Sequence, residues 1–355
     1  MSVSEWEQAQ PAQRERRMTI IGIAYDIMSV SGREPVKPAY LGRPTAVSII
    51  LRGVHTRMEV LMSFITYLIN GISLGSVYAL IALGYTMVYG IAKMLNFAHG
   101  DVIMIGAFTV YTISSTMGLP PVIGILVSVA VCTLLGMLIE KVAYKPLRKA
   151  SSPLAVLITA IGVSYLLQNI ALLSFGADTK SFTSVVSMAP VKFAGGRISI
   201  SGETIITIVS CIIIMIVLTL FINKSKAGQA MLAVSEDKGA AQLMGINVNA
   251  TITLTFAIGS ALAAIAGVLL CSAYPALTPY TGSMPGIKAF VAAVFGGIGS
   301  VPGAFIGGIL LGVIEIFSKA YISSQMADAI VFAVLIIVLL VKPTGLLGKN
   351  IQEKV

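Results

Sequence analysis

Charged residues are scarce in this 355-residue chain. Asp, Glu, Lys and Arg make up 11% of it, against about 25% in a typical soluble domain. Hydrophobic residues make up 56%, and the mean hydropathy is +0.92. These values exclude a soluble globular domain and indicate an all-α protein that crosses a membrane several times. The formal net charge of +9 lies in short basic runs between apolar segments, which is typical of membrane orientation rather than of nucleic-acid binding.

The chain also has few cysteines and lacks a P-loop motif for phosphate binding. The three cysteines, Cys132, Cys211 and Cys271, lie in separate apolar runs without CxxC spacing, so neither a disulfide framework nor a metal site is expected. No GxxxxGK[ST] sequence is present, and the nearest fragment, residues 348–350, lacks the leading glycine and the hydroxyl residue. We therefore expect no cofactor, no ATP site and no catalytic residue in this chain.

Long apolar runs predict the membrane-spanning helices, each of which needs about 20 residues. Such runs lie at residues 62–81, 101–117, 122–142, 153–175, 204–222, 250–273 and 325–341. Two further stretches, 84–95 and 286–319, are interrupted by glycine or proline, and splitting the second at 299–302 gives about ten segments in all, with about eight as the lower count. Short interrupted elements in both halves suggest an inverted repeat of five plus five segments around a pathway.

The basic residues predict the orientation. With both termini in the cytoplasm, most basic residues fall in cytoplasmic loops, whereas the outward loops 118–121 and 274–285 carry no Lys or Arg. The cytoplasmic set is Lys141, Lys145, Arg148, Lys149, Lys224, Lys226, Lys238, Lys342, Lys349 and Lys354. The outward loop 176–202 also holds basic residues, but the rule is weaker for a loop of this length.

Residues 1–57 differ from the rest. They hold four prolines and the only tryptophan, Trp6, without sustained periodicity, so we expect little fixed structure there. Because Met58 and Met62 precede the first long apolar run, the native chain is expected to start at one of them. Residues 58–355 then form the transmembrane domain.

A charged island at residues 224–249 separates two hydrophobic halves. Ser235 is predicted to cap a short helix that has Glu236 and Asp237 in its first turn and Gly245 at its end. Ala240, Leu243 and Met244 would share one apolar face of that helix. We interpret this helix as a docking element for a partner protein; the alternative is a solvated loop with incidental helicity.

Polar residues at membrane depth are costly unless they pair or face water. Asn96, His99 and Asp101 flank a broken apolar element, where they either line a solute path or cap the break between two helices. Gln168 and Asn169 are weaker candidates of the same kind, and Lys288 is explained by snorkelling to the interface. Gly299, Gly303 and Gly307 have the spacing of a helix-packing surface.

Three stretches resemble one family. LNFAHGDVIMIGAF at residues 95–108 and GIKAFVAAVFGGIGSVPGAFIGG at 286–308 are similar to the LivH-type permease subunits of bacterial branched-chain amino-acid ABC importers. SEDKGAAQLMGIN at 235–247 resembles the cytoplasmic loop with which that family contacts its ATPase subunit. The resemblance runs from about residue 62 to the C terminus, and residues 1–57 have no counterpart in it.

The resemblance implies a function and a set of partners. This chain would be a permease in the bacterial plasma membrane for leucine, isoleucine, valine or related small solutes. Its partners would be a second homologous permease, two cytoplasmic ATPases that bind the ATP, and an extracytoplasmic solute-binding protein. Related permeases carry urea or amides, which remain alternatives. An ion-coupled secondary transporter needs buried coupling carboxylates, for which the segments offer Glu140 and Glu315, and a channel needs a repeated filter that the sequence lacks.

Overall fold

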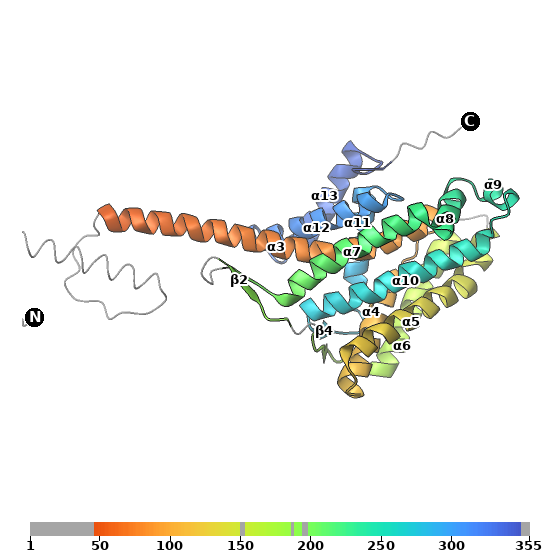
Figure 1. Ribbon diagram of the computed structural model, residues 1–355, viewed down its shortest axis with the longest axis horizontal. Coiled ribbons are helices and arrows are strands. Elements are labelled where there is room, and N and C mark those ends of the chain that lie inside the picture. The colour runs from red at the N-terminus through yellow and green to blue at the C-terminus, as the bar shows by residue number, and fades with distance from the viewer. Residues whose placement is uncertain (1–45, 150–152, 186–187, 194–197, 349–355) are drawn as a thin grey trace, which may run out of the picture. The chain divides into compact units, whose positions relative to one another are not determined.

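Helices form almost all of the protein in the computed structural model, which describes residues 46–149, 153–185, 188–193 and 198–348. The chain divides into two units, Met1–Ile65 and Thr66–Val355. Of the first unit only the beginning of helix α3 is described, and the second contains all other elements (Figure 1). Most of the segment expected to lack structure, residues 1–45, lies outside the described residues, whereas its last part is helical because α3 begins at Ala46.

Helix α3 (Ala46–Ala92) corrects the predicted segment count. It runs without a break through 62–81 and through 84–92, and only residues 93–95 of the second predicted segment lie outside it. The two predicted segments are therefore one helix. Glycine within a helix costs about 1 kcal/mol relative to alanine, but here the glycines serve packing. A Cβ on Gly84 would lie 2.6 Å from Nε2 of His99, and one on Gly90 would lie 3.3 Å from Cα of Gly299.

The other predicted segments correspond to observed helices. They are α4 (His99–Tyr111) with a π-helical turn (Thr112–Thr116), α5 (Pro121–Ile139) with a second π turn (Glu140–Tyr144), α6 (Pro153–Phe175), α7 (Gly202–Lys224), α10 (Val248–Ala273) and α13 (Ala327–Val341). The predicted split of 286–319 is confirmed by α11 (Ser283–Gly296) and α12 (Val301–Tyr321). Among the described residues, six helices are long and apolar enough to cross a membrane: α3, α5, α6, α7, α10 and α12.

Helix α10 is the centre of the fold. In the apolar 18-residue stretch of α10, 78% of the residues are buried inside the protein, whereas in the corresponding stretches of α6 and α7 only 17% are buried. It packs along α4 and α5 (Figure 1). The faces that α6 and α7 leave uncovered are apolar, as expected for helices that contact lipid or another membrane subunit.

A long helix followed by a short one occurs twice. α3 is followed by the short α4 and then by α5, and α10 is followed by the short α11 and then by α12. α3 and α12 are antiparallel, because Gly71 contacts Val313 while Gly90 contacts Gly299. Short elements therefore recur in both halves, whereas the inverted relation between the halves stays a prediction, and merging two segments into α3 removes the count of five plus five.

The strands are short and lie in the loops predicted to face outward. β1 (Lys180–Ser181) pairs antiparallel with β4 (Ala276–Leu277), and β2 (Val191–Phe193) pairs with β3 (Ile198–Ile200). The β2–β3 hairpin leads into α7 at the end opposite to the helices α8 and α9 (Figure 1). The strand pair β1–β4 ties the loop after α6 to the loop after α10.

Candidate functional site

Two short helices begin at the same place inside the protein. Residues 93–98 are non-helical and lead into α4, and the loop after β4 leads into α11. The backbones of Gly100 and Gly282 meet there, and a Cβ on Gly100 would lie 2.6 Å from the Gly282 carbonyl oxygen. Only glycine permits this approach of two backbones. The two helix N termini therefore meet inside the protein, and neither start has a side-chain cap.

Gln168 joins the two helix starts. Its Nε2 donates to Oδ1 of Asp101 on α4 at 2.9 Å and lies 3.3 Å from Oγ of Ser283 on α11. Asp101 is in the first helical turn, where the helix dipole favours a carboxylate. Asn169 does not join this cluster: it is exposed, and its Nδ2 donates to the Tyr165 carbonyl of its own helix.

Asn96 and His99 are both buried, but neither side chain caps α4. Oδ1 of Asn96 accepts a hydrogen bond from the Tyr144 hydroxyl at 2.9 Å. The ring of His99 lies edge-on to Tyr85 at 4.7 Å between centroids, and its Nε2 has no hydrogen-bond partner among the described residues. The idea that these side chains cap the break is therefore wrong, since the N-cap residue is Ala98.

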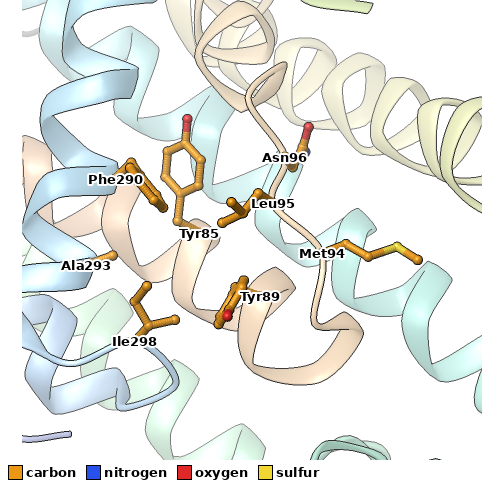
Figure 2. A pocket seen from close by; sticks show the side chains of 8 residues that line it. All are labelled: Tyr85, Tyr89, Met94, Leu95, Asn96, Phe290, Ala293 and Ile298. Carbon is orange, nitrogen blue, oxygen red and sulfur yellow. The ribbon is translucent and has the colours of Figure 1, made fainter. Parts of the chain in front are cut away.

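Aromatic rings border the smaller of two cavities along α3. Tyr85 stacks edge-on against Phe290 of α11 at 5.8 Å, and Phe97 lies 5.6 Å from the same ring. Tyr85 and Phe290 line a narrow inner pocket that lies between α3, α11 and the segment 93–98 (Figure 2). Its free volume is about 10 Å³, enough for about one water molecule. Its lining residues are Tyr85, Tyr89, Met94, Leu95, Asn96, Phe290, Ala293 and Ile298.

The outer cavity is wider, with a volume of about 220 Å³. It lies between α3, the end of α10, the loop after β4 and α12, and is lined by Leu74, Tyr78, Leu270, Tyr274, Ala276, Thr281, Pro285, Glu315 and Lys319. Sequence reasoning missed it, because its lining comes from four separate segments. The signal in the sequence was the presence of Glu315 and Lys288 inside apolar runs.

A network of charges adjoins this outer cavity. Glu315 accepts hydrogen bonds from Lys288 at 2.9 Å, from Lys319 at 2.6 Å and from the Tyr78 hydroxyl at 2.9 Å. Lys288 also pairs with Asp328 at 2.6 Å. Lys288 is only 6% exposed, so the prediction that it snorkels to the interface is wrong: its ammonium group pairs with the buried Glu315 and with Asp328, whose side chain is 45% exposed.

The charged island forms two helices, α8 (Lys226–Glu236) and α9 (Lys238–Leu243). Ser235 is not the cap that was predicted: it lies within α8 and donates to the Leu232 carbonyl. Asp237 caps α9 instead, because its Oδ1 accepts from the backbone of Gly239 and Ala240 at 2.7 and 3.0 Å. Glu236 therefore ends α8 rather than beginning α9. Gly245 follows α9 in a left-handed conformation, φ 84°, which favours glycine.

Large apolar side chains are exposed at the end of α9. Leu243 is 90% exposed and Met244 82% exposed, and Ala240 beside them is also exposed. Large exposed apolar patches mark contacts with other proteins or with membranes, which makes this tip a candidate interaction site.

One polar contact anchors the base of this exposed tip, and a second polar cluster lies near it. Lys238 donates to the carbonyl of Ala92, the last residue of α3, at 2.9 Å. Burial lowers the pKa of Lys238, and the nearby charges of Arg148 and Lys93 lower it further. Arg148 also pairs with the buried Glu140, whose other oxygen accepts from Thr253 at 2.6 Å. Lys238 thus joins α9 to the end of α3, and Glu140 joins the end of α5 to α10.

The three spaced glycines have different surroundings. Gly303 and Gly307 lie against the backbone of α11, at Gly296 and Ala292. Gly299 does not take part in that packing: it has φ 94° in the turn between α11 and α12, and a Cβ there would meet nothing within 4 Å.

Comparison with known proteins shows the family. Residues 67–339 match the family model described as "Branched-chain amino acid transport system / permease component". The chain is 45% identical over 307 residues to the high-affinity branched-chain amino acid transport system permease protein LivH of Salmonella typhimurium, and 44% identical over 307 residues to LivH of Escherichia coli. Each alignment covers 84% of this chain and 99% of the relative. BraD of Pseudomonas aeruginosa is 45% identical over 311 residues, which cover 84% of this chain and 100% of BraD. The chain, a multi-pass membrane protein, therefore belongs to the branched-chain amino acid transport system permease family.

Proposed function

We propose that this chain is a permease subunit of an ABC importer and moves branched-chain amino acids across the bacterial plasma membrane. The observation that carries the proposal is the 44–45% identity to LivH and BraD over almost the whole length of those permeases. The interior of the chain fits a permease, because two short helices start within the core and two cavities lie along α3. The chain itself contributes no ATP chemistry.

The basic ends of the helices give the proposed orientation. Lys93, Lys141, Arg148 and Lys238 lie at one end of the helices, which we place in the cytoplasm. Residues 342–348, which follow α13, are at the same end, because Gly345 and Gly348 contact Gly297. α3 ends there, so Thr66 lies at the opposite, extracytoplasmic end. The prediction of a cytoplasmic N terminus assumed that residues 62–81 and 84–95 were two separate membrane segments. Because they form the single helix α3, that prediction is not part of this proposal.

The exposed tip of α9 is the proposed contact with the ATPase. Its apolar residues, Leu243 and Met244, protrude into the compartment where ATP is available, and a partner surface would bury them. The complete importer would contain two cytoplasmic ATPases, a second permease and an extracytoplasmic binding protein. The uncovered apolar faces of α6 and α7 leave room for the second permease or for lipid.

Reconstitution tests this function. The chain is co-expressed with its partner permease, ATPases and binding protein, and uptake of radiolabelled leucine, isoleucine and valine into proteoliposomes is measured. We expect uptake that requires ATP and every partner, and that excess urea or acetamide does not inhibit. Uptake by the purified chain alone, driven by an ion gradient, would show a secondary transporter. Uptake of urea in place of leucine would show a different substrate class.

A further inference from the structure

We propose that the outer cavity is a binding site for the zwitterionic backbone of the transported amino acid, with Lys319 holding the α-carboxylate and Glu315 the α-ammonium group. This inference rests on the proposed function, because it names where the substrate of that function binds. The cavity opens at the end of α10 that we place outside the cytoplasm, where a solute released from a binding protein would arrive. Its volume of about 220 Å³ exceeds by far the single-water space of the inner pocket.

The charges around the cavity balance. Two cations, Lys288 and Lys319, face two anions, Glu315 and Asp328, so the network has no net charge. A zwitterion adds no net charge when it enters, whereas a free carboxylate or a free amine would leave one unpaired charge beside the buried Lys288 and Glu315. The network should therefore favour an amino acid over an analogue that lacks either charged group.

The hydrogen bonds of Glu315 allow an exchange of partners. An ionised carboxylate offers about four acceptor positions, and Lys288, Lys319 and Tyr78 occupy three of them. Lys319 lines the cavity and is the more accessible of the two lysines, because its side chain is 39% exposed and that of Lys288 is 7% exposed. When the substrate carboxylate binds Lys319, the position on Glu315 Oε1 becomes available to the substrate ammonium group. Lys288 and Tyr78 keep Glu315 in place during this exchange.

The rest of the lining suits an aliphatic side chain. Leu74 of α3 and Leu270 of α10 form apolar walls, and Pro285 at the start of α11 adds a third. Thr281 lies among these walls, and its hydroxyl accepts from the backbone of Thr278 at 2.7 Å. Charged groups on one wall and aliphatic groups on the others match the two ends of leucine or valine.

A cysteine protection assay tests binding directly. Thr281→Cys places a thiol in the cavity, while Cys132, Cys211 and Cys271 are fully buried and should not react. Millimolar leucine should slow labelling of Thr281→Cys by a membrane-impermeant thiol reagent in the assembled complex, whereas 4-methylpentanoate and 3-methylbutylamine, which lack one charge each, should not. Ser324→Cys, in the exposed turn after α12, is the matched control, and leucine should leave its labelling unchanged.

Transport by lysine variants gives the second test. Lys319→Met should lower leucine uptake about tenfold or more, the scale of one charged hydrogen bond, and should abolish leucine protection at position 281. Lys319→Arg should restore part of both. Lys192→Met, which removes the same charge from the exposed hairpin strand β2, should do neither. The thermal midpoint of Lys319→Met should fall, because the network then carries one unbalanced negative charge beside the buried Glu315, and Lys319→Arg should recover it; uptake is therefore expressed per folded complex.

The outcomes separate this site from the function of the chain. If the parent complex imports leucine but leucine does not protect Thr281→Cys, or both single-charge analogues protect equally, or Lys319→Met imports normally, the cavity is not the substrate site. If the parent complex imports no branched-chain amino acid, the proposed function itself fails.

Discussion

Replacing Met244 by glutamate tests the proposed docking surface. Met244 is 82% exposed and Leu243 90% exposed, so neither side chain stabilises the isolated chain appreciably. If the ATPase buries Met244, that burial contributes about 1.5–3 kcal/mol to binding. Glutamate loses this contribution and adds the cost of desolvating a charge. Because 1.4 kcal/mol is a factor of ten in affinity, the ATPase should bind at least about tenfold, and up to several hundredfold, more weakly.

The assay is co-purification of the ATPase with tagged permease, followed by ATP hydrolysis stimulated by the substrate-loaded binding protein. Gln229→Glu adds the same charge to an exposed position of α8 and is the control, which should retain both. Folding of the Met244 variant is checked by its thermal midpoint, which should not change. Full retention of the ATPase and of stimulated hydrolysis by Met244→Glu would refute the assignment of the α9 tip as the docking surface.

Three further results are expected. Asn96→Leu should lower the free energy of unfolding by about 1–3 kcal/mol, because the buried Tyr144 hydroxyl loses its acceptor. Adding Tyr144→Phe to Asn96→Leu should recover part of this loss. Uptake per folded complex is measured for Asn96→Leu and for His99→Leu, and it falls only if these residues line the solute path. Deleting residues 1–57 should leave insertion and uptake intact, since the family match begins at residue 67; loss of assembly in vesicles would contradict this. Lys238→Met should keep the ATPase bound but lower the leucine imported per ATP, whereas Lys226→Met should change neither.

The long apolar runs predicted most helices closely, because a helix in contact with lipid needs an uninterrupted apolar run. α6 and α13, for example, agree with the predicted segments to within a few residues. The error at α3 has a physical origin. Glycine at position 84 looked like a break, but it makes room for His99, and only the packed structure shows which glycines end a helix and which admit a neighbour.

The candidate site was less predictable than the fold. Gln168 and Asp101 were singled out as separate polar residues, and the structure joins them through one hydrogen bond. The partners of Lys288 could not be found, because Glu315 and Asp328 lie on different helices and the sequence carries no signal of their pairing. Asp237, rather than Ser235, became the cap of α9 because α8 extends one residue beyond Ser235.

Helix α3 connects the three places on which the proposed function depends. Its outer part, at Tyr78, lines the outer cavity and holds Glu315, and its middle, at Tyr85, forms the aromatic barrier with Phe290. Its last carbonyl, at Ala92, accepts from Lys238 beside the docking tip. Position between two sites does not by itself establish coupling. A continuous helix, however, transmits axial displacement because every turn is hydrogen-bonded to the next, so a shift of α9 on the ATPase should reach Tyr85 along α3, with the Lys238–Ala92 contact as one route beside the packing of α9 on α8 and α10. Docking and transport would then be separable by substitution, with Met244 required for the first and Lys238 for the second.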